Sequence, residues 1–254
     1  MPERSAPPDA FGRAAREYEQ GRPEWPAELV DRVIERLGLG PRATVLDLGA
    51  GTGKLTRALV PRFVHVYAVE PDDAMRAVLE EVVPGAEARP GHAGEIPLGR
   101  EAVDAVFSAE AFHWFATRET VEELERVLAP RGGLAIFWNM PENDMEPEIG
   151  EEATALIDAA FRRGGAPGLP RVLSGEWRAC FEGSRFGALR EESLDRWIVG
   201  DRETWIANLL SVSSIAALPD TERAVFAKRL RELAPEGEYR RRFRTVAYWT
   251  RLRP

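Results

Sequence analysis

The chain alternates between short apolar runs and segments in which apolar residues recur every three or four positions. The apolar runs predict strands over 44–48, 64–70, 86–91, 103–109 and 134–138. The periodic segments predict helices near 26–37, 55–60, 73–82 and 121–128. Because each right-handed crossover lays a helix over a parallel sheet, this order predicts an α/β domain with a doubly wound, mostly parallel sheet up to residue 140.

The rhythm changes after residue 140. There the pattern predicts, in chain order, a helix over 149–161, a loop over 164–170, short strand-like pieces over 184–199, helices over 202–212 and 220–233, and a closing strand over 243–252. We expect the two late helices to form a helical cap near the C-terminus. The predicted organisation is a disordered tail over 1–12, an α/β core over 13–140, and the rest of the sheet over 141–254 with the cap at about 200–235.

Composition and charge exclude several classes of protein. The 254 residues carry 42 acidic and 34 basic side chains, a formal net charge of −8 that would repel a phosphate backbone, so we expect no nucleic-acid partner. No apolar run approaches the roughly 20 residues that span a bilayer. The single cysteine, Cys180, cannot form an intrachain disulfide, and the polar N-terminal segment does not resemble a signal peptide. These features predict a cytoplasmic protein without a membrane partner and leave its oligomeric state open.

The strongest chemical signal is VLDLGAGTGKLT, residues 45–56. Gly49, Gly51 and Gly53 fall where the first predicted strand turns into its helix, and glycines there let the backbone bend tightly and approach a ligand. Glu70 ends the second predicted strand, the position of a carboxylate that accepts hydrogen bonds from ribose hydroxyls. Together these features predict a nucleotide-binding turn.

The spacing of this turn argues against two common nucleotide sites. A dinucleotide fold needs G-x-G-x-x-G, but Lys54 stands where the third glycine should fall, which disfavours a nicotinamide-dependent oxidoreductase. A Walker loop needs a hydroxyl after its lysine, where this chain has Leu55. Asp47, just before the glycines, either faces the positive end of a ligand or holds the glycine loop through backbone donors.

Several segments resemble the motifs of the class I S-adenosylmethionine-dependent methyltransferases. They are VLDLGAGTG (45–53), VYAVEP (66–71), GHAGEIPL (91–98) and VDAVFSAEAFHWF (103–115), in that order. FGRAAREYEQGRPEWP (11–26), together with AFHWF, is similar to the small-molecule branch that includes trans-aconitate methyltransferase-like, or methyltransferase type 11, proteins. The resemblance implies a Rossmann-like, seven-stranded sheet and in-line transfer of a methyl group from S-adenosylmethionine to a small-molecule carboxylate or hydroxyl. It also implies S-adenosylhomocysteine as the product and no metal.

The resemblance also implies which residues bind the cofactor. It places the methionine part against the glycine turn with Asp47 near its amino group, the ribose against Glu70, and the adenine beside the loop that starts at His92. The implied cofactor-binding residues are Tyr18, Arg22, Asp47, Gly49, Ala50, Gly51, Gly53, Glu70, Pro71, Met75, His92, Ala93 and Ser108. Many relatives carry Asp at the position of His92 and Glu at that of Gly94, so here we expect the backbone amide of Ala93 to contact the adenine.

Tyr18 and Arg22 have two interpretations. Four positions apart on a helix, they share one face, and an arginine can hold a carboxylate with two hydrogen bonds. The residues alone favour a solvated surface, because charged side chains are mostly exposed. The resemblance implies instead that the Y-x-x-x-R-P element closes over the cofactor, so we predict that both residues cap the site.

His113 is the candidate catalytic residue. It follows the carboxyl end of the fourth predicted strand, where ligands bind in open α/β sheets, and histidine titrates near neutrality. The alternative is a packed ring that only lines the site, since a carboxylate acceptor is already ionised and needs no base. Trp114, Trp138 and Asn139 are the candidate substrate residues, with core packing as the alternative for Trp138.

Two other classes of protein are alternatives to a small-molecule methyltransferase. A non-catalytic module that binds the cofactor or its product would carry the same glycine turn and Glu70. A DNA or RNA methyltransferase is disfavoured, because SAEAFHWF replaces the Asn/Asp-Pro-Pro-aromatic element that such enzymes often carry after the fourth strand. The arginine-rich YRRRFR (239–244) is too short to indicate nucleic acid in an acidic chain, although its charge suits an anionic substrate.

Overall fold

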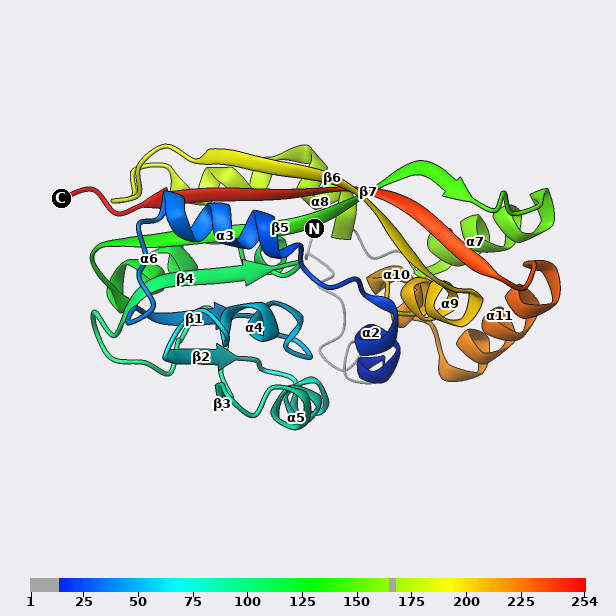
Figure 1. The fold of residues 1–254 in the computed structure, drawn as a ribbon, viewed down its shortest axis with the longest axis horizontal. Helices are drawn as coiled ribbons and strands as arrows, with labels where there is room; N and C mark the ends of the chain where they lie inside the picture. Colours follow the sequence, from blue (N-terminus) through cyan, green and yellow to red (C-terminus); the bar gives the residue numbers. More distant parts are fainter. Residues whose placement is uncertain (1–13, 165–167) are drawn as a thin grey trace. The chain divides into compact units, whose positions relative to one another are not determined.

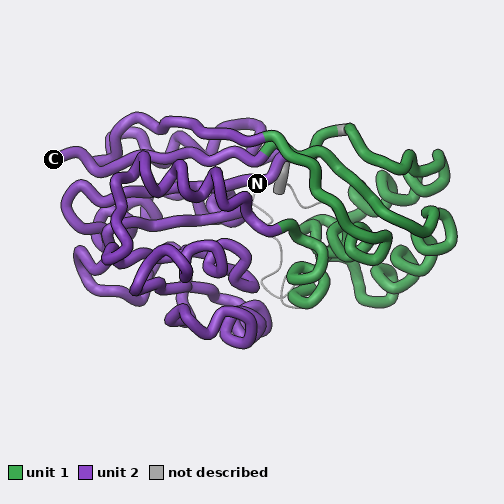
Figure 2. The backbone as a smooth tube through the Cα atoms, in the orientation of Figure 1, with its two compact units in different colours: residues 1–23, 141–169, 195–244 green, residues 24–140, 170–194, 245–254 purple. Residues whose placement is uncertain are grey.

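The computed structural model describes residues 14–164 and 168–254. The predicted disordered tail over 1–12 lies outside these residues. The chain forms two compact units, which Figure 2 colours separately. Unit 1 comprises residues 1–23, 141–169 and 195–244, and unit 2 comprises residues 24–140, 170–194 and 245–254. Each unit therefore combines segments that lie far apart in the sequence.

Among the described residues, seven strands form one sheet (Figure 1). The strands are β1 (Thr44–Leu48), β2 (His65–Val69), β3 (Glu87–Arg89), β4 (Val103–Ala109), β5 (Leu128–Glu146), β6 (Arg190–Asp201) and β7 (Glu238–Arg251). Their order across the sheet is β3-β2-β1-β4-β5-β7-β6, and the first five are parallel to one another. The predicted doubly wound, mostly parallel, seven-stranded sheet is confirmed.

Strand β7 runs against β5. The N–H of Leu252, just beyond β7, donates to the carbonyl of Gly132 (3.0 Å), and the Thr245 hydroxyl donates to the side-chain carbonyl of Asn139 (2.7 Å). Residue numbers therefore fall along β7 as they rise along β5, which makes this pair antiparallel. The remaining strands of the predicted sheet are thus added through β7.

The helices largely follow the predicted periodicity. The α-helices of the described residues are α2 (Ala15–Gly21), α3 (Ala27–Arg36), α4 (Lys54–Leu59), α5 (Asp73–Val82), α6 (Arg118–Val127), α7 (Glu151–Gly164), α8 (Gly168–Ser174), α9 (Arg202–Leu210), α10 (Ser213–Ala216) and α11 (Asp220–Leu233). Two 3-10 helices, η1 (Phe112–Trp114) and η2 (Glu176–Phe181), were not predicted. Asp72 caps α5 by accepting hydrogen bonds from the N–H groups of Ala74 and Met75 (both 2.9 Å). Within the described part of the chain, no helix is long and apolar enough to cross a membrane.

Strand β5 is much longer than the predicted strand over 134–138. Its first part contains Pro130 and two glycines, and its last part is acidic, both typical of loops. The acidic part is neutralised across the sheet, because Arg242 of β7 lies 3.1 Å from Glu142 and Arg240 lies 3.4 Å from Glu146. Pairing with a segment about 100 residues away thus extends the strand, and the local pattern does not contain that information.

Three other predictions were wrong in extent. The predicted loop over 164–170 is helical from Gly168 onward, since Pro170 occupies the first turn of α8, where its missing N–H costs nothing. Residues 165–167 lie outside the described residues. Of the short strand-like pieces predicted over 184–199, the part from Arg190 onward forms one strand, β6, and the closing strand begins earlier than predicted, at Glu238.

The core of unit 2 lies on both faces of the sheet, because neighbouring residues of a strand face opposite sides. On β1, Val45 belongs to one buried cluster and Leu46 to the other, and on β4 Phe107 and Val106 divide in the same way. Helices α3 and α4 cover the side of Val45, while α6 and η2 cover the side of Leu46. Two buried faces explain why these strands read as continuous apolar runs.

Unit 1 has a buried cluster of its own, formed mainly by α7, α9 and α11. Close backbone contacts hold its helices together. A Cβ atom on Gly21 of α2 would lie 2.1 Å from the backbone nitrogen of Asn208 in α9, and one on Gly164 would lie 1.6 Å from the carbonyl oxygen of Ser214. The Asn208 amide also donates to the Gly21 carbonyl (3.0 Å). The contact between α2 and α9 therefore requires glycine at position 21.

We expect Gly21→Ala to lower the free energy of unfolding by about 2–3 kcal/mol, because the added Cβ cannot fit without moving the Asn208 backbone. Urea unfolding followed by circular dichroism measures this. Gly150→Ala is the matched control in the same unit, since a Cβ there meets no atom within 4 Å. Equal stability of the two variants would contradict the packing described for α2.

Candidate functional site

The glycine turn connects β1 to α4 at the carboxyl edge of the sheet. Gly49 has a φ of +71°, and a Cβ on it would lie 2.8 Å from the Cβ of Ala111. Gly53 also has a positive φ, +86°, and a Cβ there would lie 2.9 Å from Val83. The turn therefore needs glycine at both positions for its backbone conformation and for its close packing.

Hydrogen bonds fix this turn to the end of β2. The N–H groups of Gly49 and Ala50 both donate to the carbonyl of Val69, at 2.9 and 3.1 Å. The next residue, Glu70, accepts from the N–H of Gly51 through Oε2 (2.8 Å) and from the N–H of Asp72 through Oε1 (3.0 Å). Burial raises the pKa of the Glu70 carboxyl, which is only 8% exposed. The sequence-predicted turn and acid thus form one unit, as expected for a nucleotide site.

Asp47 lies beneath the turn and is 1% exposed. Its Oδ2 accepts a hydrogen bond from the Thr56 hydroxyl (2.7 Å), whereas its Oδ1 has no hydrogen-bond partner within the described chain. Burial raises the pKa of Asp47 to about 7, and the nearby Glu70 carboxylate adds to that rise while the Thr56 hydrogen bond opposes it. Thr56 also holds Asp47 through its backbone N–H, which agrees in part with the interpretation that Asp47 holds the loop, while the Oδ1 atom suits a ligand with a positive or hydrogen-bonding end.

The residues predicted on the adenine side differ in burial. Met75 is buried, and its sulfur lies 3.9 Å from where a Cβ on Gly51 would be, so it borders the turn. Pro71 and His92 are exposed, while Ala93 packs into the core of unit 2. The N–H of Glu95 donates to the His92 carbonyl (3.1 Å), which closes this loop into a tight turn.

Ser108 joins the ends of two strands. Its hydroxyl is fully buried and donates to the carbonyl of Leu48 (2.8 Å), linking β4 to β1 directly before the glycine turn. Its place at the carboxyl end of β4 agrees with the prediction. Its hydroxyl, however, is engaged with the backbone, so Ser108 acts there by positioning the strands.

Sequence reasoning missed Glu110. This residue follows β4 with a φ of +55°, a conformation uncommon outside glycine, and its N–H donates to the Phe137 carbonyl (2.9 Å). Its carboxylate accepts from the N–H of Asn139 (2.7 Å), and the Asn139 side-chain carbonyl accepts from Thr245. An acid directly after a buried strand was the available signal, and Glu110 proves to fix the candidate substrate residue Asn139.

His113 lies in η1 and is bound by Trp138. The indole Nε1–H of Trp138 donates to His113 Nδ1 (3.1 Å), and both rings are buried. A neutral imidazole whose Nδ1 accepts a hydrogen bond carries its proton on Nε2, so the ring presents a donor there. Trp114 lies beside it, with ring centroids 4.8 Å apart, and Trp138 packs on Trp177 at the same distance. This arrangement favours the interpretation of His113 as part of an aromatic wall over that of a base.

Tyr18 and Arg22 belong to unit 1. Their side chains lie together, with the guanidinium carbon 5.2 Å from the Tyr18 ring centroid. Arg22 also donates from Nε to the Ser211 hydroxyl (3.0 Å) and from a terminal nitrogen to the Ser211 carbonyl (3.2 Å). The pair is therefore ordered rather than freely solvated. That it caps the cofactor stays a prediction.

Lys54, the residue that breaks the dinucleotide spacing, has a structural role in unit 2. Its side chain is mostly buried, and its Nζ lies 2.7 Å from Glu24 Oε1. The lysine thereby ties α4 to the segment that precedes α3. A glycine at this position, as in a dinucleotide fold, would remove that tie.

Comparisons with known proteins agree with the geometry. A family model described as a methyltransferase domain matches residues 46–136. A methyltransferase-like protein of Schizosaccharomyces pombe is 34% identical over 221 residues, which cover 86% of this chain and 83% of that protein. The chain belongs to the class I S-adenosylmethionine-dependent methyltransferases.

Other relatives of this methyltransferase cover less of it or are more distant. A methyltransferase of Mycobacterium tuberculosis is 46% identical over 132 residues, 51% of this chain and 52% of that protein. A protein of Anaeromyxobacter dehalogenans described as a type II methyltransferase has a similar fold, with a TM-score of 0.64 over 92% of this chain and 99% of that one at 23% identity. The family implies S-adenosylmethionine as the methyl donor, in place of a nicotinamide. The narrower likeness to the trans-aconitate branch stays a prediction.

The buried Asp47 predicts a specific pH dependence of stability. Its pKa of about 7 in the folded protein lies above the ordinary aspartate pKa of 3.8, so the folded protein binds this proton more tightly than the unfolded chain. The contribution to stability is therefore greatest below pH 4 and falls as the pH rises to about 7, by roughly 3–4 kcal/mol in all. Asp47→Asn should abolish this loss.

The measurement is urea unfolding of both proteins between pH 4.5 and 8. The free energy of unfolding of Asp47→Asn minus that of the unmodified protein should rise with pH across this window. Any constant cost of the asparagine amide cancels in the trend. Asp104→Asn, at an exposed carboxylate of β4, is the control. A difference that does not change with pH would show that Asp47 is ionised in the folded protein at all these values.

Proposed function

We propose that this methyltransferase transfers the methyl group to a small molecule, and that the attacking atom is a carboxylate or hydroxyl oxygen. The hydrogen bond from Trp138 to His113 Nδ1 carries the proposal (3.1 Å). A histidine held this way donates from Nε2, so the site favours an acceptor that is already ionised and needs no base. That favours a carboxylate over a hydroxyl. The formal net charge of −8 supports a small molecule over nucleic acid.

The residues of the turn fit S-adenosylmethionine. When bound, this cofactor supplies a methyl group attached to a positively charged sulfur, and that sulfur is a good leaving group. Asp47 Oδ1, buried and without a partner among the described residues, suits its positively charged amino group. The backbone from Gly49 to Gly53, with Ala50, forms the close approach to the methionine part. We assign these residues the binding of that end of the cofactor.

Glu70 and its neighbours fit the nucleoside end. Glu70 accepts two backbone hydrogen bonds, and a carboxylate offers about four acceptor sites, so it retains capacity for ribose hydroxyls. Buried Met75 and the adjoining Pro71 suit the apolar face of the adenine. The backbone amide of Ala93, in the turn that begins at His92, suits its polar edge.

We assign the acceptor to the wall formed by η1, after β4, and by the middle of β5. Its members are His113, Trp114, Trp138 and Asn139. Trp138 is itself packed against Trp177, so the wall is rigid as well as apolar. Because in-line transfer depends mainly on holding the acceptor lone pair at near contact with the methyl group, a rigid wall is what the reaction requires of the protein.

Incubation with labelled S-adenosylmethionine and a matched panel of carboxylic acids, phenols and amines tests the acceptor class. We expect label in the acids, released by alkali as an ester would be. Glu70→Gln, with weakened cofactor binding, is the negative control. Transfer to amines alone would overturn the proposed acceptor, and binding of S-adenosylhomocysteine without transfer to any compound would favour the non-catalytic module.

The His113→Gln variant distinguishes a structural role of His113 in the aromatic wall from a role as general base. Glutamine can still accept the Trp138 hydrogen bond and donate on its other side, so we expect kcat within about threefold of the unmodified enzyme and an unchanged pH profile. Loss of a true general base costs about 100- to 10,000-fold. Steady-state kinetics on the best acid of the panel decide the matter. A loss in that range, with the fall in activity at low pH removed, would restore His113 as the base.

A further inference from the structure

The arginines of β7 divide between two faces of the strand. Residues 239–244 read YRRRFR, and alternate side chains of a strand point to opposite sides. Arg240 and Arg242 point to the side where acids of β5 lie, and Arg242 also approaches Asp195 of β6 (3.6 Å). These two arginines are therefore neutralised by carboxylates of unit 1.

Arg241 lies on the other face, between the buried Tyr239 and Phe243. Its contacts are a long hydrogen bond from Nε to the Glu142 carbonyl (3.4 Å) and the face of the Phe243 ring, 5.7 Å from the guanidinium carbon. No carboxylate in the described part of the chain forms an ion pair with it. Burial lowers the pKa of the Arg241 guanidinium, and a half-buried cation without an anion is costly to the fold.

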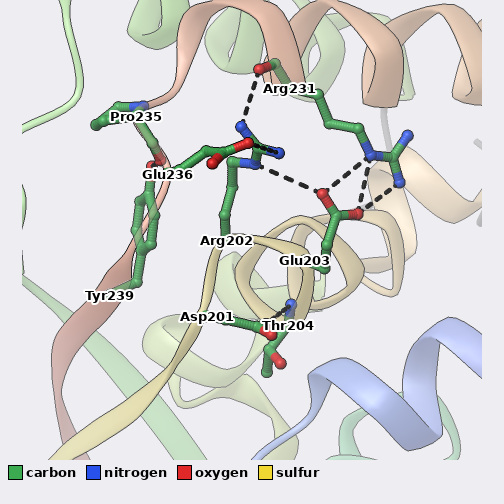
Figure 3. Close-up of polar contacts among 8 residues, drawn as sticks. All are labelled: Asp201, Arg202, Glu203, Thr204, Arg231, Pro235, Glu236 and Tyr239. Atoms are coloured by element: carbon green, nitrogen blue, oxygen red, sulfur yellow. Dashed lines mark hydrogen bonds and ion pairs between the residues drawn. The ribbon is translucent and has the colours of Figure 1, made fainter.

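Two other arginines of unit 1, Arg202 and Arg231, are each paired with a carboxylate. In Figure 3, Arg231 donates from Nε to Glu203 (2.9 Å) and Arg202 donates to Glu236 (3.3 Å). The same view shows the Tyr239 hydroxyl donating to the Pro235 carbonyl (2.8 Å), so this tyrosine is satisfied without Arg241. Arg241 thus differs from these arginines in lacking an acidic partner.

Arg241 borders a cavity of about 50 Å³ within unit 1. On the measure by which a single water needs about 10–15 Å³, this volume has room for a carboxylate together with the carbon atoms next to it. Most of its lining is apolar. The apolar lining residues include Met145, Ile198, Trp205 and Phe243, and the charged ones are Arg241 and Asp201. The Asp201 carboxylate caps α9 by accepting a hydrogen bond from the N–H of Thr204 (2.8 Å), so Arg241 is the lining residue that offers a positive charge. Trp205 and Tyr239 are stacked, with ring centroids 4.9 Å apart, which gives the cavity a rigid aromatic side.

We propose that this cavity binds the carboxylate end of a small organic acid, with Arg241 as the residue that recognises its charge. A guanidinium offers a planar pair of donors that matches a carboxylate, and an apolar lining strengthens the pairing by excluding water. The apolar side chains accept the carbon atoms next to the carboxylate. The inference concerns unit 1 alone and does not depend on the proposed function.

Calorimetric titration of the full chain without cofactor tests the site. The ligands are butyrate, butanol and butylamine, which match in length and differ in charge. We expect butyrate to bind and the other two not to. Arg241→Gln should weaken butyrate binding at least tenfold, whereas Arg240→Gln, which removes an arginine from the opposite face of the same strand, should change it less than twofold.

The outcomes separate this inference from the proposed function. Equal binding of the three ligands, or unchanged binding of butyrate by Arg241→Gln, would overturn the carboxylate site. Arg241→Met and the butyrate-induced rise in the melting temperature of the unmodified protein provide second readings if the glutamine variant is poorly folded. Butyrate binding that depends on Arg241 supports the site even if no acid is methylated. Failure of the proposed function is therefore read from the labelling panel, and failure of this site from the titration.

Discussion

A hydrogen bond from a backbone N–H to a buried carboxylate fixes the glycine turn to which we assign cofactor binding. Glycines have no side chains to anchor them, so the turn after β1 is positioned by its N–H groups: Gly51 donates to Glu70, and Gly49 donates to Val69. Both acceptors lie at the end of β2. The parallel pairing of Leu48 with Val69 brings the two strand ends level, and the rest of the site is built outward from there.

The two acids near the turn make the folded protein prefer a cation. Asp47 and Glu70 are both buried, and the charge of Glu70 adds to the effect of burial in raising the pKa of Asp47. A ligand with a positive group would relieve this repulsion and pair with Asp47 Oδ1. In the assignment proposed above, the electrostatic cost in the free protein and the fit of a cationic cofactor have one cause.

The geometry of the aromatic residues in η1 and in the middle of β5 favours a role in shape over one in proton transfer. The indole N–H of Trp138 donates to His113 Nδ1, and this hydrogen bond fixes both the orientation and the tautomer of the imidazole ring. The arginines of β7 in unit 1 also differ in their partners. Those that face the acids of β5 are neutralised, whereas Arg241 has no acidic partner among the described residues and is the arginine that we assign to a ligand. Both features depend on which side chains face each other across strands.

The local pattern determined the parallel half of the sheet well. The runs that became β1, β2, β4 and the middle of β5 are apolar on both faces, so burial alone specifies them, and glycines with a following acid mark the cofactor turn. Motif order then identified the family. These features are encoded within a few residues of each other, which is why a single sequence reveals them.

Tertiary structure decided the remainder, because the interactions responsible join residues far apart in the chain. The length of β5 depends on arginines of β7, and Glu110 gains its role only by meeting Asn139. Whether His113 could act as a base depended on the indole of Trp138, 25 residues away. Likewise, YRRRFR is a run of like charges in the sequence, and only pairing across the sheet distinguishes Arg241 from its neutralised neighbours.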